Sequence, residues 1–426
     1  MNYKIEQLPS YNLHIIKTNK FKNVEVTICF RRPITKNERT IRSVLVNTLL
    51  DTSKKYKTGR EIEIETEELY GSYINIYSMN SGKCSILGAT TTFLNEKYTE
   101  SGQFNRAIDL LYELLLNPNV SNNKFNEKSF LLAKDIVKDA IKSRKDNPVE
   151  YATNRLFEEI NPKNPITFKT NLKDLNKINE ENLYKYYLDV INNDTIDIFV
   201  VGDVTDKMIK DLKKKFVFKK RAYQELDHYT IEHNICKEVI TKESLPVKQS
   251  TICLGYVFDE LSDFESRYVM KILNYILGGS SDSLLFKTVR EKESLCYGIS
   301  SSYGLLSGGL LIRAGIDKNN FNKTKKLILQ EVENLKNGQF SLDEIKKGQT
   351  CYENSCINMQ DSIGEISSLY RSICFIKSDT PENRIKNIKK VKKDDVIKLA
   401  NKMHLSKIFF LEGSIKWKKQ ILLTLT

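Results

Sequence analysis

Residues 278–300 read GGSSDSLLFKTVREKESLCYGIS, and the interpretation of the whole chain starts from this stretch. The ten residues before it, YVMKILNYIL, carry apolar side chains at 269, 272, 273 and 276, which is the spacing of one buried helix face. Gly278 and Gly279 follow at a place where glycine commonly ends a helix. Residues 283–293 predict a second, charged helix, and alternating side chains from Tyr297 onward predict a strand.

Two kinds of site are compatible with this stretch. The glycine pair resembles a phosphate-binding turn, but neither GxxxxGK[ST] nor GxGxxG is present, so we do not expect a phosphate site. Arg290 near the helix end and Tyr297 at the strand start could together bind a carbonyl or carboxylate group, because both side chains donate hydrogen bonds. The alternative is an Arg290 paired with Glu291 or Glu293 and a tyrosine packed in a core. Residue types alone favour that alternative.

The second half of the chain repeats the order of elements in the first half. The predicted order in each half is β–α–α–β–β–α–α–α–β, with a hairpin in the first half around the NSG turn at 80–82. The pattern therefore predicts two α+β domains with largely antiparallel sheets: residues 1–222, a linker at 223–247 and residues 248–426. The matching segments are TIC at 27–29 and 251–253, LYG at 69–71 and CYG at 296–298, NSG at 80–82 and LSG at 306–308, and Gly202 and Gly413 at strand ends.

Several elements of the first half have clear sequence signals. Strands are predicted at 24–30 and 195–204, and a helix with one buried face at 41–50. Further helices are predicted at 61–71, 104–118, 125–148 and 176–191, of which two end at Pro118 and Pro148.

Composition narrows the classes of protein. Hydrophobic residues make up 40% of the 426 positions, enough for sizeable cores, and the net charge is +13. The lysines are scattered, so we expect solvated helix faces and no nucleic-acid partner. The eight cysteines lack zinc-like spacing and lie among apolar neighbours, which predicts free thiols in a reducing compartment. Neither a leader segment nor an apolar run of membrane-spanning length occurs, so we expect a cytoplasmic protein without a membrane partner.

Residues 278–317, GGSSDSLLFKTVREKESLCYGISSSYGLLSGGLLIRAGID, resemble a signature of the insulinase-type zinc peptidases. This family includes pitrilysin and the mitochondrial processing peptidases, and its signature combines a glycine pair, V-R-E-K, a tyrosine, a strand and a turn. The resemblance implies that Arg290 and Tyr297 bind substrate near the scissile bond, which reverses the preference stated above. It also implies two homologous halves, each a duplicated α/β sandwich-like domain, that form half of a clam-like chamber.

The zinc site of that family has no counterpart here. The family carries HxxEH on the first helix of its first half, where histidines and a downstream Glu bind zinc and the motif Glu acts as general base. The resemblance places Ser43 and Asn47 at the histidine positions and Val46 at the base, with the downstream ligand near Asp139–Ala140. Valine cannot accept a proton, and Ser and Asn are poor zinc ligands. We therefore expect a degenerate metal site and no metal in this chain.

A second histidine motif, HYTIEH, contains His228, Glu232 and His233. On a helix, histidines five residues apart lie about 140° apart around the axis and do not share a metal easily. The segment also falls in the predicted linker. We do not expect a metal site there.

The resemblance implies a non-catalytic, substrate-binding subunit of a heterodimeric insulinase-type zinc peptidase that hydrolyses peptides. The partner chain would carry HxxEH, the zinc and the catalytic residues; a homodimer is the other possible assembly. The chain is also similar to bacterial family members associated with modification of elongation factor P. The alternative is a non-enzymatic peptide-binding or scaffold protein, and this translation-factor modification pathway is one in which it could act. An active zinc enzyme with unusual ligands would need a ligand cluster, and none is visible in the sequence.

Overall fold

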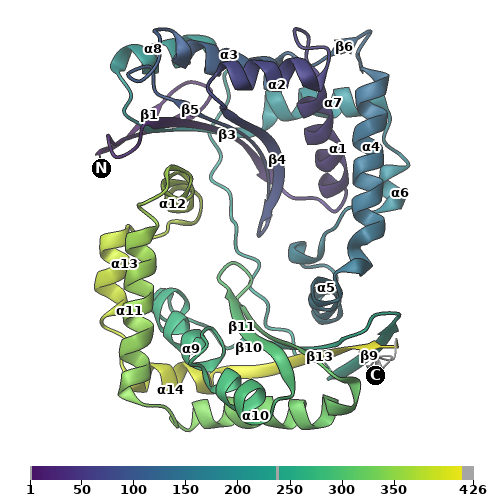
Figure 1. Ribbon diagram of the computed structural model, residues 1–426, viewed down its shortest axis with the longest axis vertical. Helices are drawn as coiled ribbons and strands as arrows, with labels where there is room; N and C mark the ends of the chain where they lie inside the picture. The colour runs from purple at the N-terminus through teal and green to yellow at the C-terminus, as the bar shows by residue number, and fades with distance from the viewer. Residues whose placement is uncertain (1, 237–238, 415–426) are drawn as a thin grey trace, which may run out of the picture. The chain divides into compact units, whose positions relative to one another are not determined.

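The computed structural model describes residues 2–236 and 239–414, which form two compact units (Figure 1). Unit 1 consists of Met1–Lys142, Phe168–His228 and Ile357–Thr380, and unit 2 consists of Ser143–Thr167, Tyr229–Cys356 and Pro381–Thr426. The predicted boundaries at 222 and 247 describe the repeat in the sequence, whereas the compact units interleave along it. Of the predicted linker and second domain, residues 237–238 and 415–426 lie outside the described residues.

In the described part of unit 1, a six-stranded sheet has the strand order β1-β2-β8-β3-β5-β4. Its pairs are antiparallel except for β2 and β8, which run parallel. The strands are β1 (Asn2–Gln7), β2 (Asn12–Lys17), β3 (Asn23–Pro33), β4 (Tyr73–Ser81), β5 (Cys84–Leu94) and β8 (Thr195–Gly202), and a small ribbon joins β6 (Val120–Ser121) to β7 (Lys124–Phe125). The helices are α1 (Glu38–Asp51), α2 (Gly59–Glu68), α3 (Gln103–Leu116), α4 (Glu127–Lys142), α6 (Leu172–Leu175), α7 (Glu180–Asn193), α8 (Asp206–Lys215) and α12 (Ile363–Ile376).

The alternation of side chains along β3 separates the two faces of this sheet. Val26 and Ile28 join the larger core with α1, α3, α4, α7 and α8, whereas Cys29 lies on the opposite face, in the smaller core that α12 covers. Because successive strand residues point to opposite faces, Arg31 shares the α12 face with Cys29. The larger core fixes α1 against the sheet, and the smaller core fixes α12.

Unit 2 repeats this plan. Its described residues form a five-stranded sheet in the order β11-β12-β10-β13-β9, antiparallel except where β13 pairs with β9. The strands are β9 (Ile240–Leu245), β10 (Ser250–Phe258), β11 (Cys296–Gly304), β12 (Gly309–Ile316) and β13 (Met403–Gly413). The helices are α5 (Pro148–Ile160), α9 (Met270–Leu277), α10 (Phe321–Lys336), α11 (Leu342–Asn358, which reaches the unit boundary), α13 (Pro381–Ile388) and α14 (Lys393–Asn401).

Each unit has one sheet face covered by a helix from the other half of the sequence. In unit 2, Ala152 and Leu156 of α5 pack on Phe409 and Leu411 of β13. In unit 1, Ile366 of α12 packs in the same way on the sheet. The fold prediction is confirmed: two homologous α/β halves with largely antiparallel sheets and helical cover. The exchange of α5 and α12 is an addition that the repeat pattern does not show.

The predicted helix at 125–148 is wrong at its end. Helix α4 stops at Lys142, and Pro148 begins α5, which the sequence interpretation did not include. Proline is compatible with a first helical turn because the N–H that it lacks has no intrahelical partner there. The Asn147 side chain caps α5 by accepting a hydrogen bond of 3.1 Å from the Glu150 N–H. Asn147-Pro148 is therefore the start of a helix, whereas the sequence pattern predicts a helix end there.

The prediction that a helix ends at Gly278 is confirmed. The Gly278 N–H donates to the Asn274 carbonyl oxygen at 3.1 Å, and the backbone φ of Gly278 is −162°, an extended value that any residue adopts. The need for glycine is steric, since a Cβ at this position would lie 2.7 Å from the Ser301 backbone nitrogen. The missing side chain lets the end of α9 approach β11.

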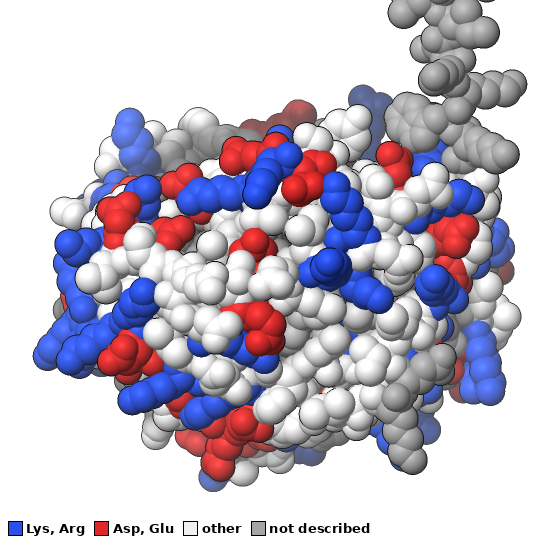
Figure 2. Space-filling view, turned by 90° about the horizontal axis from the view of Figure 1, so that it is seen from below, with Lys and Arg blue, Asp and Glu red and all other residues white. Residues whose placement is uncertain are grey.

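The surface charge and the cysteine thiols of the structure correspond to the pattern predicted from the sequence. On the face drawn in Figure 2, Lys and Arg are interspersed with Asp and Glu, so this face has mixed charge. All eight cysteines are free thiols, and four of them are buried. Across residues 2–236 and 239–414, every helix is too short or too polar to cross a bilayer.

Candidate functional site

Arg290 and Tyr297 lie on either side of a short connection in unit 2. Arg290 belongs to a π-helical turn, Phe286–Lys292, and its guanidinium carbon lies 4.4 Å from the centroid of the Phe286 ring. A π-helical turn is rare and is frequent at functional sites. The turn directs the exposed Arg290 side chain over an aromatic face, which limits its freedom before any ligand arrives.

Tyr297 is held by a second irregularity. On β11, Cys296 pairs with Ile316 but Ile299 pairs with Ala314, so the register shifts at Tyr297 and Gly298. Such bulges redirect side chains beside functional sites. Tyr297 is 85% exposed, which excludes the alternative of a tyrosine packed in a core.

The alternative for the arginine is not seen either. Glu293 pairs with Lys323 at 2.6 Å, and within the described residues neither an ion pair nor a hydrogen bond engages the Arg290 guanidinium. A cation and a phenol, both exposed and both set by local irregularities, are therefore free to bind a ligand. Peptide carbonyls and carboxylates accept hydrogen bonds from both groups.

The three residues that the resemblance places at a degenerate metal site lie on α1, and the two polar ones bond within the helix. Ser43 Oγ donates to the Arg39 carbonyl at 2.9 Å, and Asn47 Nδ2 donates to the Ser43 carbonyl at 2.7 Å. Val46 is buried in the larger core of unit 1. Asp139 and Ala140, the downstream positions, are exposed on α4. None of these side chains is arranged as a metal ligand.

The side chains of the HYTIEH motif have separate partners. His228 Nδ1 bonds to Ser81 Oγ at 2.8 Å, and His233 Nδ1 bonds to the Phe258 carbonyl at 2.7 Å. Burial, followed by the charge of Arg31, lowers the pKa of His228 to about 4, so its ring is neutral at pH 7. The motif has a structural role in both units.

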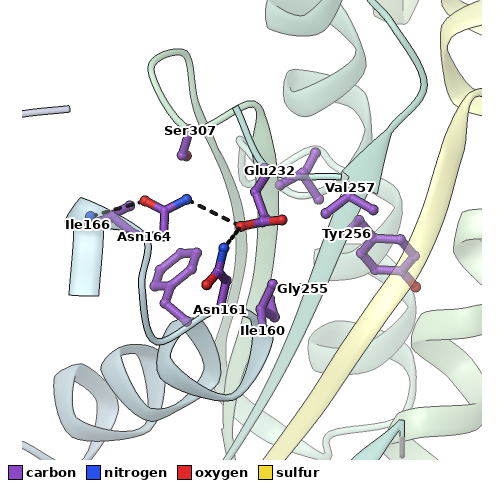
Figure 3. Close-up of a pocket in the computed structure, with 12 residues that line it drawn as sticks. Ile160, Asn161, Asn164, Ile166, Glu232, Gly255, Tyr256, Val257 and Ser307 are labelled. Carbon is purple, nitrogen blue, oxygen red and sulfur yellow. Dashed lines mark hydrogen bonds between the residues drawn. The ribbon is translucent and has the colours of Figure 1, made fainter. Parts of the chain in front are cut away.

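Glu232, the third member of that motif, borders a small pocket of unit 2 (Figure 3). Its carboxylate accepts a hydrogen bond of 2.7 Å from Asn161 Nδ2, and Asn164 Nδ2 lies 3.4 Å away. The cavity volume is about 20 Å³, which is room for about one water molecule. These contacts attach the segment around Glu232 to the loop after α5, and the space is too small for a peptide.

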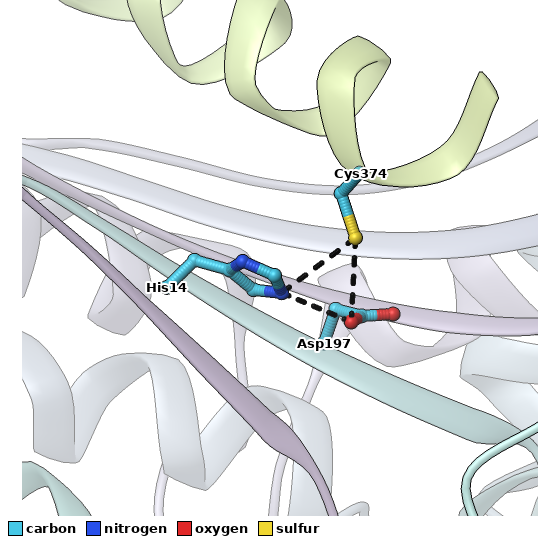
Figure 4. A group of neighbouring side chains, drawn as sticks. All are labelled: His14, Asp197 and Cys374. Carbon is cyan, nitrogen blue, oxygen red and sulfur yellow. Dashed lines mark hydrogen bonds and ion pairs between the residues drawn. The ribbon is translucent and has the colours of Figure 1, made fainter. Parts of the chain in front are cut away.

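A group that the sequence did not predict lies in unit 1 (Figure 4). Cys374 points from α12 towards the sheet, where His14 of β2 and Asp197 of β8 meet. Burial, followed by the carboxylate of Asp197, raises the pKa of the Cys374 thiol to about 12. Although burial opposes it, the hydrogen bond from His14 and the charge of Arg31 lower the pKa of Asp197. The three residues are separated by so much sequence that no spacing motif joins them; polar His14 and Asp197 within buried strands were the one available signal.

Comparison with known proteins shows similarity to M16 peptidases. A sequence profile described as "Peptidase M16 inactive domain" matches residues 177–350. A Bacillus subtilis protein described as "Probable inactive metalloprotease YmfF" is 28% identical over 408 residues, which cover 94% of this chain and 95% of that protein. "Uncharacterized zinc protease YmxG" of the same organism is 25% identical over 334 residues, covering 75% and 79%.

A solved structure has the same fold over nearly the whole chain. The crystal structure of a conserved protein from Enterococcus faecalis V583 is 26% identical and has a TM-score of 0.89, covering 98% of this chain and all of that one. Two of these proteins are described as metalloprotease or zinc protease, in keeping with the resemblance to zinc peptidases that the sequence around Arg290 suggests. The chain is therefore similar to M16 peptidases over most of its length, and its sequence contains no HxxEH.

Proposed function

We propose that this chain is the non-catalytic, peptide-holding subunit of a heterodimeric M16 peptidase, and that a partner chain with HxxEH supplies the zinc and the water nucleophile. The proposal rests on the exposure and the local backbone geometry of Arg290 and Tyr297. Both side chains are exposed, and Arg290 has no ionic partner among the described residues. Both also stand on backbone irregularities of kinds that are frequent beside functional sites.

The chemistry assigned to this subunit is orientation. The guanidinium of Arg290 would donate to a peptide carbonyl, and the phenol of Tyr297 would donate to a second acceptor of the same peptide. Holding a peptide in this way lowers the entropic barrier to attack by water on the partner's metal. The name of the Bacillus subtilis relative, an inactive metalloprotease, supports a chain that does not cleave peptides alone.

Reconstitution tests the proposal. The full chain is co-expressed with a candidate partner that carries HxxEH, and cleavage of a fluorogenic peptide library is measured for each chain and for the pair. We expect activity that neither chain has alone. A charged hydrogen bond contributes about 1.5–3 kcal/mol, so Arg290→Ala should lower kcat/KM by about 10- to 100-fold. Tyr297→Phe removes one neutral hydrogen bond and should lower it by about 2- to 10-fold.

Lys292→Ala is the matched control, because it removes an exposed cation from the same π-helical turn. If Lys292→Ala lowers kcat/KM as much as Arg290→Ala does, the effect comes from the positive charge of the turn in general and not from a specific contact of Arg290. Unchanged activity in both Arg290→Ala and Tyr297→Phe would refute the substrate-holding role. Peptide binding without cleavage by any pair would instead favour a non-enzymatic scaffold.

A further inference from the structure

The group formed by His14, Asp197 and Cys374 has the geometry of a metal site. Cys374 Sγ lies 3.7 Å from His14 Nε2 and 3.9 Å from Asp197 Oδ1, and Nε2 lies 3.1 Å from Oδ1. With metal–ligand bonds of about 2.0–2.3 Å, a tetrahedral zinc ion holds its ligand atoms about 3.4–3.6 Å apart. A cation between the three atoms would therefore need shifts of only a few tenths of an ångström.

Neighbouring side chains fix the orientation of His14 and Asp197 through contacts on the sides that face away from the group. Tyr3 Oη bonds to His14 Nδ1 at 2.8 Å, and the imidazole stacks on the Phe199 ring with centroids 4.3 Å apart. Arg31 Nε and Nη2 donate to Asp197 Oδ2 at 2.9 and 2.6 Å, which leaves Oδ1 directed at the group. Metal-binding His and carboxylate side chains usually have such outer hydrogen bonds, which fix their orientation.

Open space borders two of the three side chains. A cavity of about 320 Å³ in unit 1 is bordered by His14, Cys374 and Tyr223, and it is large enough to admit a hydrated cation. The Tyr223 hydroxyl lies 3.1 Å from Asp197 Oδ1 and 3.9 Å from Cys374 Sγ. A fourth ligand, either water from the cavity or this hydroxyl, is thus within reach.

We propose that unit 1 binds one divalent cation of the zinc type through His14 Nε2, Asp197 Oδ1 and Cys374 Sγ. One nitrogen, one oxygen and one sulfur ligand form the mixed set that suits zinc, whereas magnesium and calcium prefer oxygen alone. The site is separate from the degenerate positions on α1 and does not depend on the proposed peptidase role. Because Cys374 comes from the segment Ile357–Thr380, the bound cation would attach α12 to the sheet that the first half of the chain forms.

Cobalt(II) is the probe that tests this proposal. The full-length chain is stripped with a chelator and titrated with Co²⁺, and thiolate-to-cobalt charge-transfer absorption reports a sulfur ligand directly. We expect one equivalent of Co²⁺ per chain, displaced by one equivalent of Zn²⁺, and slower hydrogen exchange in α12 when Zn²⁺ is bound. Absence of the charge-transfer band in the wild-type chain would overturn the proposal.

Three variants make the test specific. Cys374→Ser should abolish the band, whereas Cys84→Ser, which changes another buried thiol of unit 1, should keep both band and affinity. Tyr3→Phe should keep the band but weaken Zn²⁺ binding by about 10- to 100-fold, because it removes an outer hydrogen bond and no ligand. Circular dichroism of the stripped variants confirms that each is folded. A band that survives in Cys374→Ser, or that Cys84→Ser also loses, would contradict the assignment.

Discussion

The strongest stability prediction concerns a buried ionic network that anchors α1. Arg42 on α1 is fully buried, and its Nη2 donates to Asp194 Oδ2 at 2.5 Å. Its Nε donates to Tyr186 Oη at 2.8 Å, and Glu38 Oε1 lies 3.3 Å away. Asp194, at the junction of α7 and β8, also accepts from Arg32 Nε. Asp194 therefore balances two guanidinium groups.

We predict that Asp194→Ala destabilises unit 1 by about 3 kcal/mol. Removing one partner of a buried ion pair costs about 3–5 kcal/mol, because the other charge is left buried. The lower end applies here, since Arg42 keeps Glu38 and Tyr186, and Arg32 keeps Asp189 at 2.7 Å. Asp194→Asn keeps the shape and one acceptor, so its loss should be smaller, about 1.5–3 kcal/mol.

Urea unfolding followed by circular dichroism at pH 7 measures these losses, and hydrogen exchange of α1 and β8 peptides assigns them to unit 1. Asp109→Ala is the control: it breaks a surface pair with Lys215 at 2.5 Å and should change stability by less than about 1 kcal/mol. The double variant Arg42→Met with Asp194→Ala should lose less unfolding free energy than the sum of the single variants, because Arg42 and Asp194 are removed together and neither leaves the other buried without its partner. If Asp194→Ala lowers the unfolding free energy no more than Asp109→Ala does, this reasoning is refuted.

Further predictions concern pH, packing and the candidate site. The pKa of His228 is about 4 in the folded chain, against an ordinary value of 6.5. As the pH falls, the unfolded chain therefore takes up this proton before the folded chain does. The unfolding free energy of the wild type should decrease by up to about 3 kcal/mol between pH 6.5 and pH 4. His228→Gln should flatten that pH dependence of the urea midpoint; an unchanged slope would exclude this histidine. Gly278→Ala should destabilise unit 2 by about 1–3 kcal/mol in thermal unfolding, because its Cβ would meet the β11 backbone, whereas Gly298→Ala, with open space around it, should be nearly neutral. Phe286→Leu removes the aromatic face under Arg290 and should weaken peptide binding by the reconstituted pair about 2- to 5-fold without changing stability; equal binding would show that the ring does not orient the arginine.

The sequence was most informative where local periodicity and short motifs act. Runs rich in β-branched and aromatic residues identified β3 and β8, helical spacing identified α1 and α9, and the NSG turn located the hairpin of β4 and β5. The Arg290–Tyr297 motif and the missing HxxEH are also properties of short stretches. The exception, Pro148, shows that a proline alone does not say whether a helix ends or begins there.

The sequence by itself determined the two homologous halves and most of their elements, and it predicted Arg290 and Tyr297 as site residues. Tertiary structure alone decided that α5 and α12 each cover a sheet of the other half, and that β2 lies parallel to β8. Period-two alternation assigns His14 and Asp197 to a sheet face, but it does not say which strands are neighbours. Neighbours are set by long-range pairing and by the burial of an otherwise exposed apolar face, which brings α12 to this sheet. That is why Cys374, 360 residues from His14, meets it only in the folded chain.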